Sequence, residues 1–219
     1  MTILVSVWGA APGIGKSTLC AGLSRSLAGA GLRVGHFREE EILTRPQFGA
    51  VAEEFAATGA VDLETLVAAT ERFVESVPAR GDDVVVADAL VPTLLAMGHD
   101  DEAIDAFTAD LTRVLAPVRP VVVFLDGNAG TALSRAGERE GAQWLDWYIG
   151  KLAAYEVSPP VSDLASTVAY LRRERAVTLG AVRRHGWGLV VVERADELTP
   201  GEVLGAVGQG IEPWLPQLP

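Results

Sequence analysis

The sequence predicts an α/β fold in which a five-stranded parallel sheet carries helices on both faces. Apolar runs rich in β-branched residues alternate with segments of helical length, a pattern typical of strand–helix–strand units. The runs are continuously apolar instead of alternating with polar residues, as expected for strands that are buried on both faces. The expected strands span residues 2–8, 32–37, 83–87, 120–125 and 188–192.

The segments between these strands are predicted to be helical. Leu19, Leu23 and Leu27 recur at helical spacing after the first strand. The connection over residues 44–80 is long enough for two helices. The connection over residues 127–187 is longer still, and we expect it to hold a lid and further helices.

A glycine-rich loop joins the first strand to the first helix. Residues 9–18 read Gly-Ala-Ala-Pro-Gly-Ile-Gly-Lys-Ser-Thr, which matches the phosphate-binding pattern G-x-x-x-x-G-K-[ST] at all but one position. Ala10 stands where the first glycine is expected, and Gly9 comes one position early. The strand before the loop and the helix after it favour a P-loop over a chance glycine turn. The expected fold is therefore a three-layer P-loop NTPase fold with a helical lid.

The loop supplies groups that bind nucleotide phosphates. Its backbone amides and the positive end of the following helix favour a phosphate anion. Lys16 can reach the β- and γ-phosphates and the Ser17 hydroxyl can bind Mg²⁺, so ATP and Mg²⁺ are the expected cofactors. The expected nucleotide-binding residues are Pro12, Gly13, Ile14, Gly15, Lys16, Ser17 and Thr18.

Charged residues follow the second and third strands, at the edge where open parallel sheets bind ligands. Arg38 could hold an acceptor, and Glu39 or Glu40 could take a proton from its hydroxyl. Asp88 ends the third strand, where it could bind Mg²⁺ or act as the base. The structural alternatives are a charged helix start and a turn aspartate.

The predicted helix after the fourth strand carries Arg135 and Arg139, four residues apart and therefore on one face. On a mobile lid over residues 127–142, this pair could close over the ATP phosphates and stabilise transition-state charge. A surface ladder with Glu138 and Glu140 is the alternative.

Aromatic residues recur at roughly helical spacing farther along the chain, and they predict either core packing or the floor of an aromatic acceptor pocket. These residues are Trp144, Trp147, Tyr148 and Tyr155. The arginines between residues 172 and 184 are interpreted mostly as a solvated helix face. The histidines show no metal-binding spacing.

Composition limits the partners and the location. A length of 219 residues suits one α/β domain over residues 1–219, and the net charge of −11 disfavours a nucleic acid polymer or an anionic membrane as partner. No apolar run approaches the length of a membrane span, and we expect no export signal. Cys20 is the single cysteine, so we expect it to be a packing residue in a reducing cytoplasm.

Taken together, these motifs resemble the thymidylate kinase and deoxynucleoside kinase branch of the P-loop kinases. Residues 37–39 resemble the Arg-Glu-Pro element after the second strand, and residues 84–98 resemble the third strand with its Asp-Arg-Tyr motif. Residues 122–140 resemble the fourth strand with its arginine-bearing lid, and residues 144–155 resemble the helix after that lid. The resemblance covers most of the chain in order.

The resemblance implies roles for the residues at these positions. Arg38 would hold the acceptor, Asp88 or Glu39 would be the acid/base group, and Arg135 with Arg139 would close the lid. Lys16 would bind the phosphates, and the loop residue next to it would bind magnesium. Members of that branch are often dimeric, so a homodimer is a further expectation from the resemblance.

Three departures from the family pattern bear on the acceptor. Glu40 replaces the proline, Ala89 and Leu90 replace the Arg-Tyr of the third-strand motif, and residues 157–187 add a helical segment. The missing arginine would clamp an acceptor phosphate. Its loss disfavours a nucleoside monophosphate as the acceptor. A neutral hydroxyl compound remains an alternative acceptor.

The sequence therefore predicts an ATP-dependent phosphotransferase that moves the γ-phosphoryl group of Mg-ATP to a small-molecule acceptor, in the first place a nucleoside or nucleotide. A non-nucleotide acceptor is one alternative. A P-loop switch ATPase acting with a protein partner is another. No apolar strand ends in Asp-Glu, and the Asn-Lys-x-Asp motif of GTPases is absent, which disfavours the switch ATPase.

Overall fold

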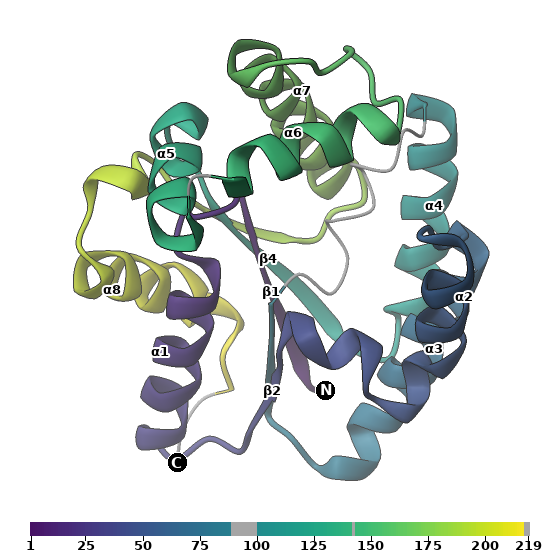
Figure 1. Cartoon of the computed structure of the whole chain (residues 1–219). Helices are drawn as coiled ribbons and strands as arrows, with labels where there is room; N and C mark the ends of the chain where they lie inside the picture. Colours follow the sequence, from purple (N-terminus) through teal and green to yellow (C-terminus); the bar gives the residue numbers. More distant parts are fainter. Residues whose placement is uncertain (89–99, 142, 217–219) are drawn as a thin grey trace.

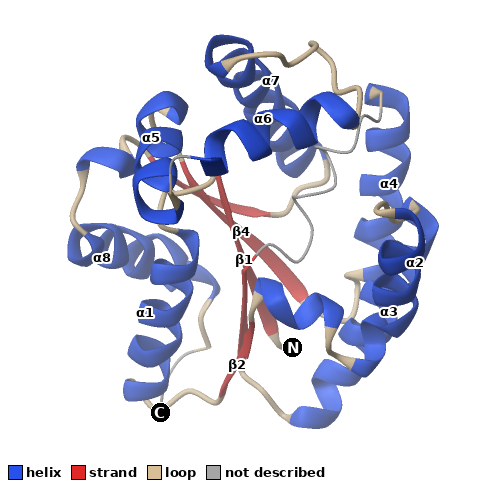
Figure 2. Ribbon diagram, in the orientation of Figure 1, coloured by secondary structure: helices blue, strands red, loops and turns tan. Residues whose placement is uncertain are grey.

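A five-stranded parallel sheet forms the centre of the computed structural model, which describes residues 1–88, 100–141 and 143–216 (Figures 1 and 2). The strand order is β2-β3-β1-β4-β5, and each neighbouring pair is parallel. The strands are β1 (Ile3–Gly9), β2 (Val34–Phe37), β3 (Val84–Asp88), β4 (Arg119–Leu125) and β5 (Gly188–Val192). The α/β class and the parallel sheet expected from the sequence are confirmed.

Helices cover both faces of the sheet and the carboxyl ends of its strands. Figure 1 places α1 and α8 on one face, α2, α3 and α4 on the other, and α5, α6 and α7 across the strand ends. Within the described ranges, no helix is long and apolar enough to span a bilayer. The helices are α1 (Lys16–Gly29), α2 (Gly49–Thr58), α3 (Leu63–Arg80), α4 (Asp101–Val114), α5 (Ala129–Glu140), α6 (Gln143–Ala154), α7 (Leu164–Arg184) and α8 (Pro200–Ile211).

The apolar runs form central strands because helices remove both of their faces from water. Val84, Val85 and Val86 are at most 1% exposed, and residues 121–125 of β4 are buried as well. Burying one such side chain stabilises the fold by about 1.5–3 kcal/mol. At the sheet edge, β5 remains half-buried over most of its length despite its apolar sequence.

The long connections contain the helices that the sequence predicts. Residues 44–80 form α2 and α3, and residues 127–187 form α5, α6 and α7. The expected lid region corresponds to α5, and the expected additional helical segment contains α7. The leucines of α1 and Cys20 are buried, as expected for packing residues.

Most helices begin at a polar side chain that caps their first amides, but α1 does not. Asp62, Asn128 and Asp163 accept hydrogen bonds from first-turn amides of α3, α5 and α7. Gly15 precedes α1 in a left-handed conformation and has no side chain to act as a cap. Because the first amides of a helix have no partner inside it, the amino end of α1 is available to a ligand.

The strand order opens a crevice beside β1. The chain leaves β1 toward β2 at one edge of the sheet and leaves β4 toward β5 at the other edge. Ligands of open parallel sheets bind at such a reversal, outside the carboxyl ends of the strands. The glycine-rich loop follows β1 directly and therefore lies at this crevice.

An aromatic cluster fixes the chain that follows β2. Phe73 of α3 lies 5.0 Å from Phe37 of β2 and 6.0 Å from Phe48 of η2 (Pro46–Phe48), between ring centroids. The Arg45 guanidinium lies 5.0 Å from the Phe37 ring centroid and pairs with Glu41 at 2.6 Å. This packing positions η1 (Glu39–Leu43), which carries the acidic residues after β2.

We predict that Phe73→Ala lowers the free energy of unfolding by about 3–5 kcal/mol, because it leaves a cavity between β2 and η2. Trp147→Ala is the control, since that side chain is 58% exposed and its loss should cost less than about 1 kcal/mol. Urea unfolding followed by circular dichroism measures both values. Equal losses in the two variants would contradict the assigned core.

Candidate functional site

The glycine-rich loop is held between β1 and α5. Gly13 has a φ of +83°, and a Cβ placed there would lie 2.5 Å from the Ala132 carbonyl oxygen and 3.0 Å from the Ala136 Cβ. Any larger residue at Gly13 would therefore be strained and would push α5 away. Gly15 has a φ of +102° and open space around it, so its requirement is conformational.

The departure from the motif at Ala10 is explained by the path of the chain. Ala10 is 6% exposed, and its amide donates a hydrogen bond of 2.9 Å to the Leu125 carbonyl at the end of β4. The close approach occurs one residue earlier, where a Cβ on Gly9 would lie 2.6 Å from Ile14 Cγ2. The position at the start of this loop that must lack a side chain is therefore occupied by Gly9.

The other loop residues present polar groups at the amino end of α1. Ser17 and Thr18 are exposed in its first turn, and Pro12 and Gly13 are half-buried. Ile14 is 7% exposed and packs inward, so only its backbone can contact a ligand. Uncapped amides, the helix dipole and the Lys16 ammonium all favour an anion at this position.

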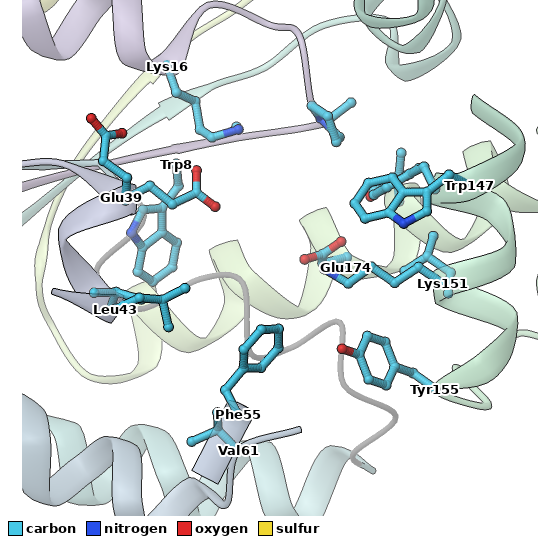
Figure 3. A pocket seen from close by; sticks show the side chains of 18 of the residues that line it. Trp8, Lys16, Glu39, Leu43, Phe55, Val61, Trp147, Lys151, Tyr155 and Glu174 are labelled. Carbon is cyan, nitrogen blue, oxygen red and sulfur yellow. The ribbon is translucent and has the colours of Figure 1, made fainter. Parts of the chain in front are cut away.

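A large cavity opens beside this loop, with a volume of about 670 Å³ (Figure 3). Its wall includes Lys16 from α1 together with Gly9, Ala11 and Pro12 from the loop. This volume is typical of sites for small organic ligands. The aromatic side chains that line it are Trp8, Phe55, Trp144, Trp147, Tyr148 and Tyr155.

The aromatic residues of α6 line this cavity, and Trp144 and Tyr148 also pack against the hydrophobic core. Trp144 and Tyr148 stack with an interplanar angle of 5° and a centroid distance of 5.2 Å. The Lys151 ammonium lies 5.5 Å from the Trp147 ring centroid and 5.9 Å from that of Tyr155. The Tyr155 hydroxyl donates to the Gly59 carbonyl at 3.1 Å, which links the end of α6 to the turn after α2.

Two of the expected carboxylates lie near Lys16. Glu39 lines the cavity, and burial raises the pKa of its carboxyl while the Lys16 charge opposes that rise. Asp88 is 4% exposed at the end of β3, and its Oδ1 atom has no hydrogen-bond partner among the described residues. The two carboxylates also act on each other, since the Asp88 charge contributes to the raised pKa of Glu39.

The structure does not bring the expected arginines into the cavity. Arg38 points outward and pairs with Glu40 at 3.5 Å. Arg135 donates a 2.7 Å hydrogen bond to the Asp196 carbonyl in η4 (Ala195–Glu197). Arg139 is 65% exposed and pairs with Glu140 at 2.7 Å. Among the described residues, the cavity wall contains no arginine.

Glu174 of α7 lies in the cavity, although nothing in the sequence pattern distinguishes it from its arginine neighbours. Burial raises the pKa of its carboxyl to about 7, against the opposing charge of Lys16. Figure 3 shows Glu174 between the two sides of the cavity, with Lys16 and Glu39 on one side and Trp147, Lys151 and Tyr155 on the other.

An ion pair holds α7 in this position. Arg175 donates to both oxygens of Asp126, with a distance of 2.7 Å from its Nε to Asp126 Oδ1. Asp126 follows β4 directly, and the Arg175 hydrogen bonds hold the pKa of its carboxyl below the ordinary value. The arginine stretch interpreted as a solvated face therefore includes a structural contact at the carboxyl ends of the strands.

The residues present fit a magnesium ion. Mg²⁺ prefers oxygen ligands and in nucleotide sites takes only one or two from the protein. The exposed Ser17 hydroxyl offers one such oxygen, and the buried Oδ1 of Asp88, which has no partner within the described ranges, offers another. In the described part of the chain, no group of three His, Cys, Asp or Glu side chains could hold a metal by itself.

No protein-family model matches the chain, and no curated protein matches it in sequence. The resemblance to nucleotide kinases thus rests on the motifs alone. Its third-strand part continues into residues 89–99, so Ala89 and Leu90 lie outside the described residues.

We predict that Glu174→Gln changes how stability depends on pH. The native pKa of about 7 lies above the ordinary value of 4.5, so the folded protein keeps a proton that the unfolded chain releases. Stability from this group is complete below pH 4.5 and falls as the pH rises through about 7. Urea unfolding across this range should therefore show Glu174→Gln gaining stability relative to the wild type as the pH increases. A constant difference between the two proteins would contradict the raised pKa of Glu174.

Proposed function

We propose that this protein is an ATP-dependent phosphotransferase with a P-loop NTPase fold, which moves the γ-phosphoryl group of Mg-ATP to a small-molecule hydroxyl. One observation carries the proposal: Lys16 belongs both to the phosphate-binding loop and to the wall of the 670 Å³ cavity. A phosphate bound at the loop would therefore face a molecule bound in the cavity. That contact is what transfer between two substrates requires.

In this proposal, the loop binds the donor. The amides of Gly13–Thr18 and the α1 dipole hold the β-phosphate, and Lys16 stabilises charge on the transferred group. Ser17 and Asp88 would hold Mg²⁺, which neutralises phosphate charge when bound. The loop contacts α5 at Gly13, and the exposed Arg139 of that helix could exchange its pair with Glu140 for the phosphates.

Glu39 is the carboxylate best placed to act on the acceptor. Its side chain lines the cavity together with Lys16, and its raised pKa makes the carboxylate a stronger proton acceptor than an exposed glutamate. The acceptor hydroxyl oxygen bonds to the γ-phosphorus while the bond from that phosphorus to the β,γ-bridging oxygen breaks. ADP leaves with the bonding pair, and the hydroxyl proton passes to Glu39.

The charge of the cavity wall favours an acceptor without a phosphate. Phosphate groups are bound best by arginine forks, and no described residue of this wall is an arginine. A nucleoside or another hydroxyl compound is thus a better candidate than a nucleotide. A screen of ATP-to-ADP conversion against nucleosides, nucleotides and other alcohols tests the whole proposal, and ATP loss that no acceptor changes would favour a switch ATPase.

A cytoplasmic location is part of the proposal. Cys20 is the single cysteine of the sequence and is buried, so it has no partner for a disulfide within the chain. A homodimer is proposed from the family resemblance alone.

We predict that Lys16→Ala lowers turnover by roughly 10²–10³-fold, because the transferred group loses a charge-stabilising donor. Arg25→Ala is the matched control, since it removes an exposed cation from the same helix and should leave turnover unchanged. Steady-state ADP formation measures both variants. Wild-type turnover in Lys16→Ala would exclude the assigned role of the loop.

We also predict that Asp88→Asn raises the Mg²⁺ concentration needed for half-maximal turnover and lowers the maximal rate by at least roughly tenfold. The amide keeps the shape of the side chain but loses its charge. Turnover is measured against Mg²⁺ at fixed ATP, and circular dichroism checks the fold. An Asn variant with unchanged Mg²⁺ dependence would remove Asp88 from the site.

A further inference from the structure

The cavity beside the loop exposes apolar surface that a folded protein normally buries. Leu43, Phe55 and Trp147 are 47%, 39% and 58% exposed, and all three line this cavity. They come from η1, α2 and α6, so the exposed surface gathers from separate parts of the chain. Exposed apolar surface of this kind marks binding sites. A ligand with an apolar body would cover it.

Aromatic rings form one wall of the same space. Trp144 and Tyr148 stack in parallel, and Trp147 lies 6.4 Å from Trp144 between centroids. Flat rings on three positions of one helix favour a flat aromatic ligand, which packs against them by offset or edge contacts.

Glu174 faces this cavity without a counter-ion from the protein. The arginines on either side of it point elsewhere, because Arg173 pairs with Asp101 of α4 and Arg175 pairs with Asp126. Glu174 itself makes no hydrogen bond or ion pair with any residue of the described ranges. A half-buried carboxylate without a partner has lost part of its hydration, and a ligand cation would offset that cost.

The balance of charges around the cavity favours a bound cation. The charged residues of its wall are Lys16, Glu39, Glu40, Lys151 and Glu174. Lys16 serves the donor phosphates in the proposed function, and the Lys151 ammonium lies over the rings of Trp147 and Tyr155. Bound ATP would make the site more negative still.

We propose that the acceptor is an aromatic amino alcohol, a molecule with a flat ring, a protonated amine and a hydroxyl. The ring packs against Trp144, Trp147 and Tyr148, the ammonium binds Glu174, and the hydroxyl points toward Glu39 and Lys16. This inference rests on the proposed phosphotransferase function, to which it adds the substrate class. The product is the phosphate ester of that hydroxyl, formed with ADP as the second product.

Equilibrium binding of three related probes tests the inference without relying on turnover. Phenylalaninol has the ring, the amine and the hydroxyl, N-acetylphenylalaninol lacks the charge, and leucinol lacks the ring. Isothermal titration should show phenylalaninol binding more tightly than N-acetylphenylalaninol by roughly 10–100-fold, the range for a hydrogen bond to a charged group. Phenylalaninol should also bind more tightly than leucinol.

Two variants separate the contributions of charge and ring. Glu174→Gln should remove most of the difference between phenylalaninol and its N-acetyl form, whereas the matched control Glu75→Gln, at an exposed position on α3, should keep it. Trp147→Ala should weaken both ring-bearing probes and leave leucinol unchanged. The pH-dependent unfolding of Glu174→Gln shows whether that variant is folded.

The outcomes distinguish this inference from the proposed function. Equal binding of the charged and acetylated probes, or no binding of phenylalaninol at millimolar concentration, would overturn the substrate class. Turnover that depends on Lys16 with a neutral or anionic alcohol would then leave the phosphotransferase standing. If phenylalaninol binds through Glu174 but never accelerates ADP formation or yields a phosphate ester, the phosphotransferase assignment fails instead.

Discussion

The ion pair between Arg175 and Asp126 determines how the helices lie over the carboxyl ends of the strands. Asp126 is the first residue after β4; its amide donates to the Val192 carbonyl at 3.0 Å and its carbonyl accepts from Ala195 at 2.7 Å. The same residue thus joins β4, β5 and, through its side chain, α7. A bidentate pair fixes both distance and orientation. Since Glu174 precedes Arg175, this pair also directs a carboxylate into the cavity.

The sheet and the donor loop could be predicted from the sequence because their signals are local. Continuous apolar runs identify the strands of a covered parallel sheet, although β5 shows that such a run does not distinguish an edge strand from a central one. The loop motif needs only a strand before Gly9 and a helix after Gly15. The presence of Asp88 and Glu39 near the loop could also be predicted, since parallel strands place the residues that follow them at one edge of the sheet. The alanine at position 10, where the loop pattern has glycine, is explained only by the close contact between Gly9 and Ile14.

The acceptor side could not be predicted because it depends on contacts between distant segments. The sequence presents Glu174 as one charge among arginines, and only the pair with Asp126 shows which way it faces. Arg38 illustrates the opposite failure: it follows β2 at the carboxyl edge of the sheet, yet it pairs with Glu40 and turns away from the cavity. Helical spacing could place Trp144 and Tyr148 on one side of α6, but not decide whether that side was core or cavity. In each case the missing information is the orientation of a helix.

The overall charge and the local charge of this protein act together on ligand choice. The chain carries a net charge of −11, and its two lysines, Lys16 and Lys151, both line the cavity. An acidic protein repels anions at long range and attracts cations, so a nucleotide must be held by strong local groups such as the loop amides and Lys16. The cavity offers no comparable cluster for a second anion among the described residues. With Glu174 left unpaired, the same charge distribution that confines phosphate to the loop favours a cation beside it.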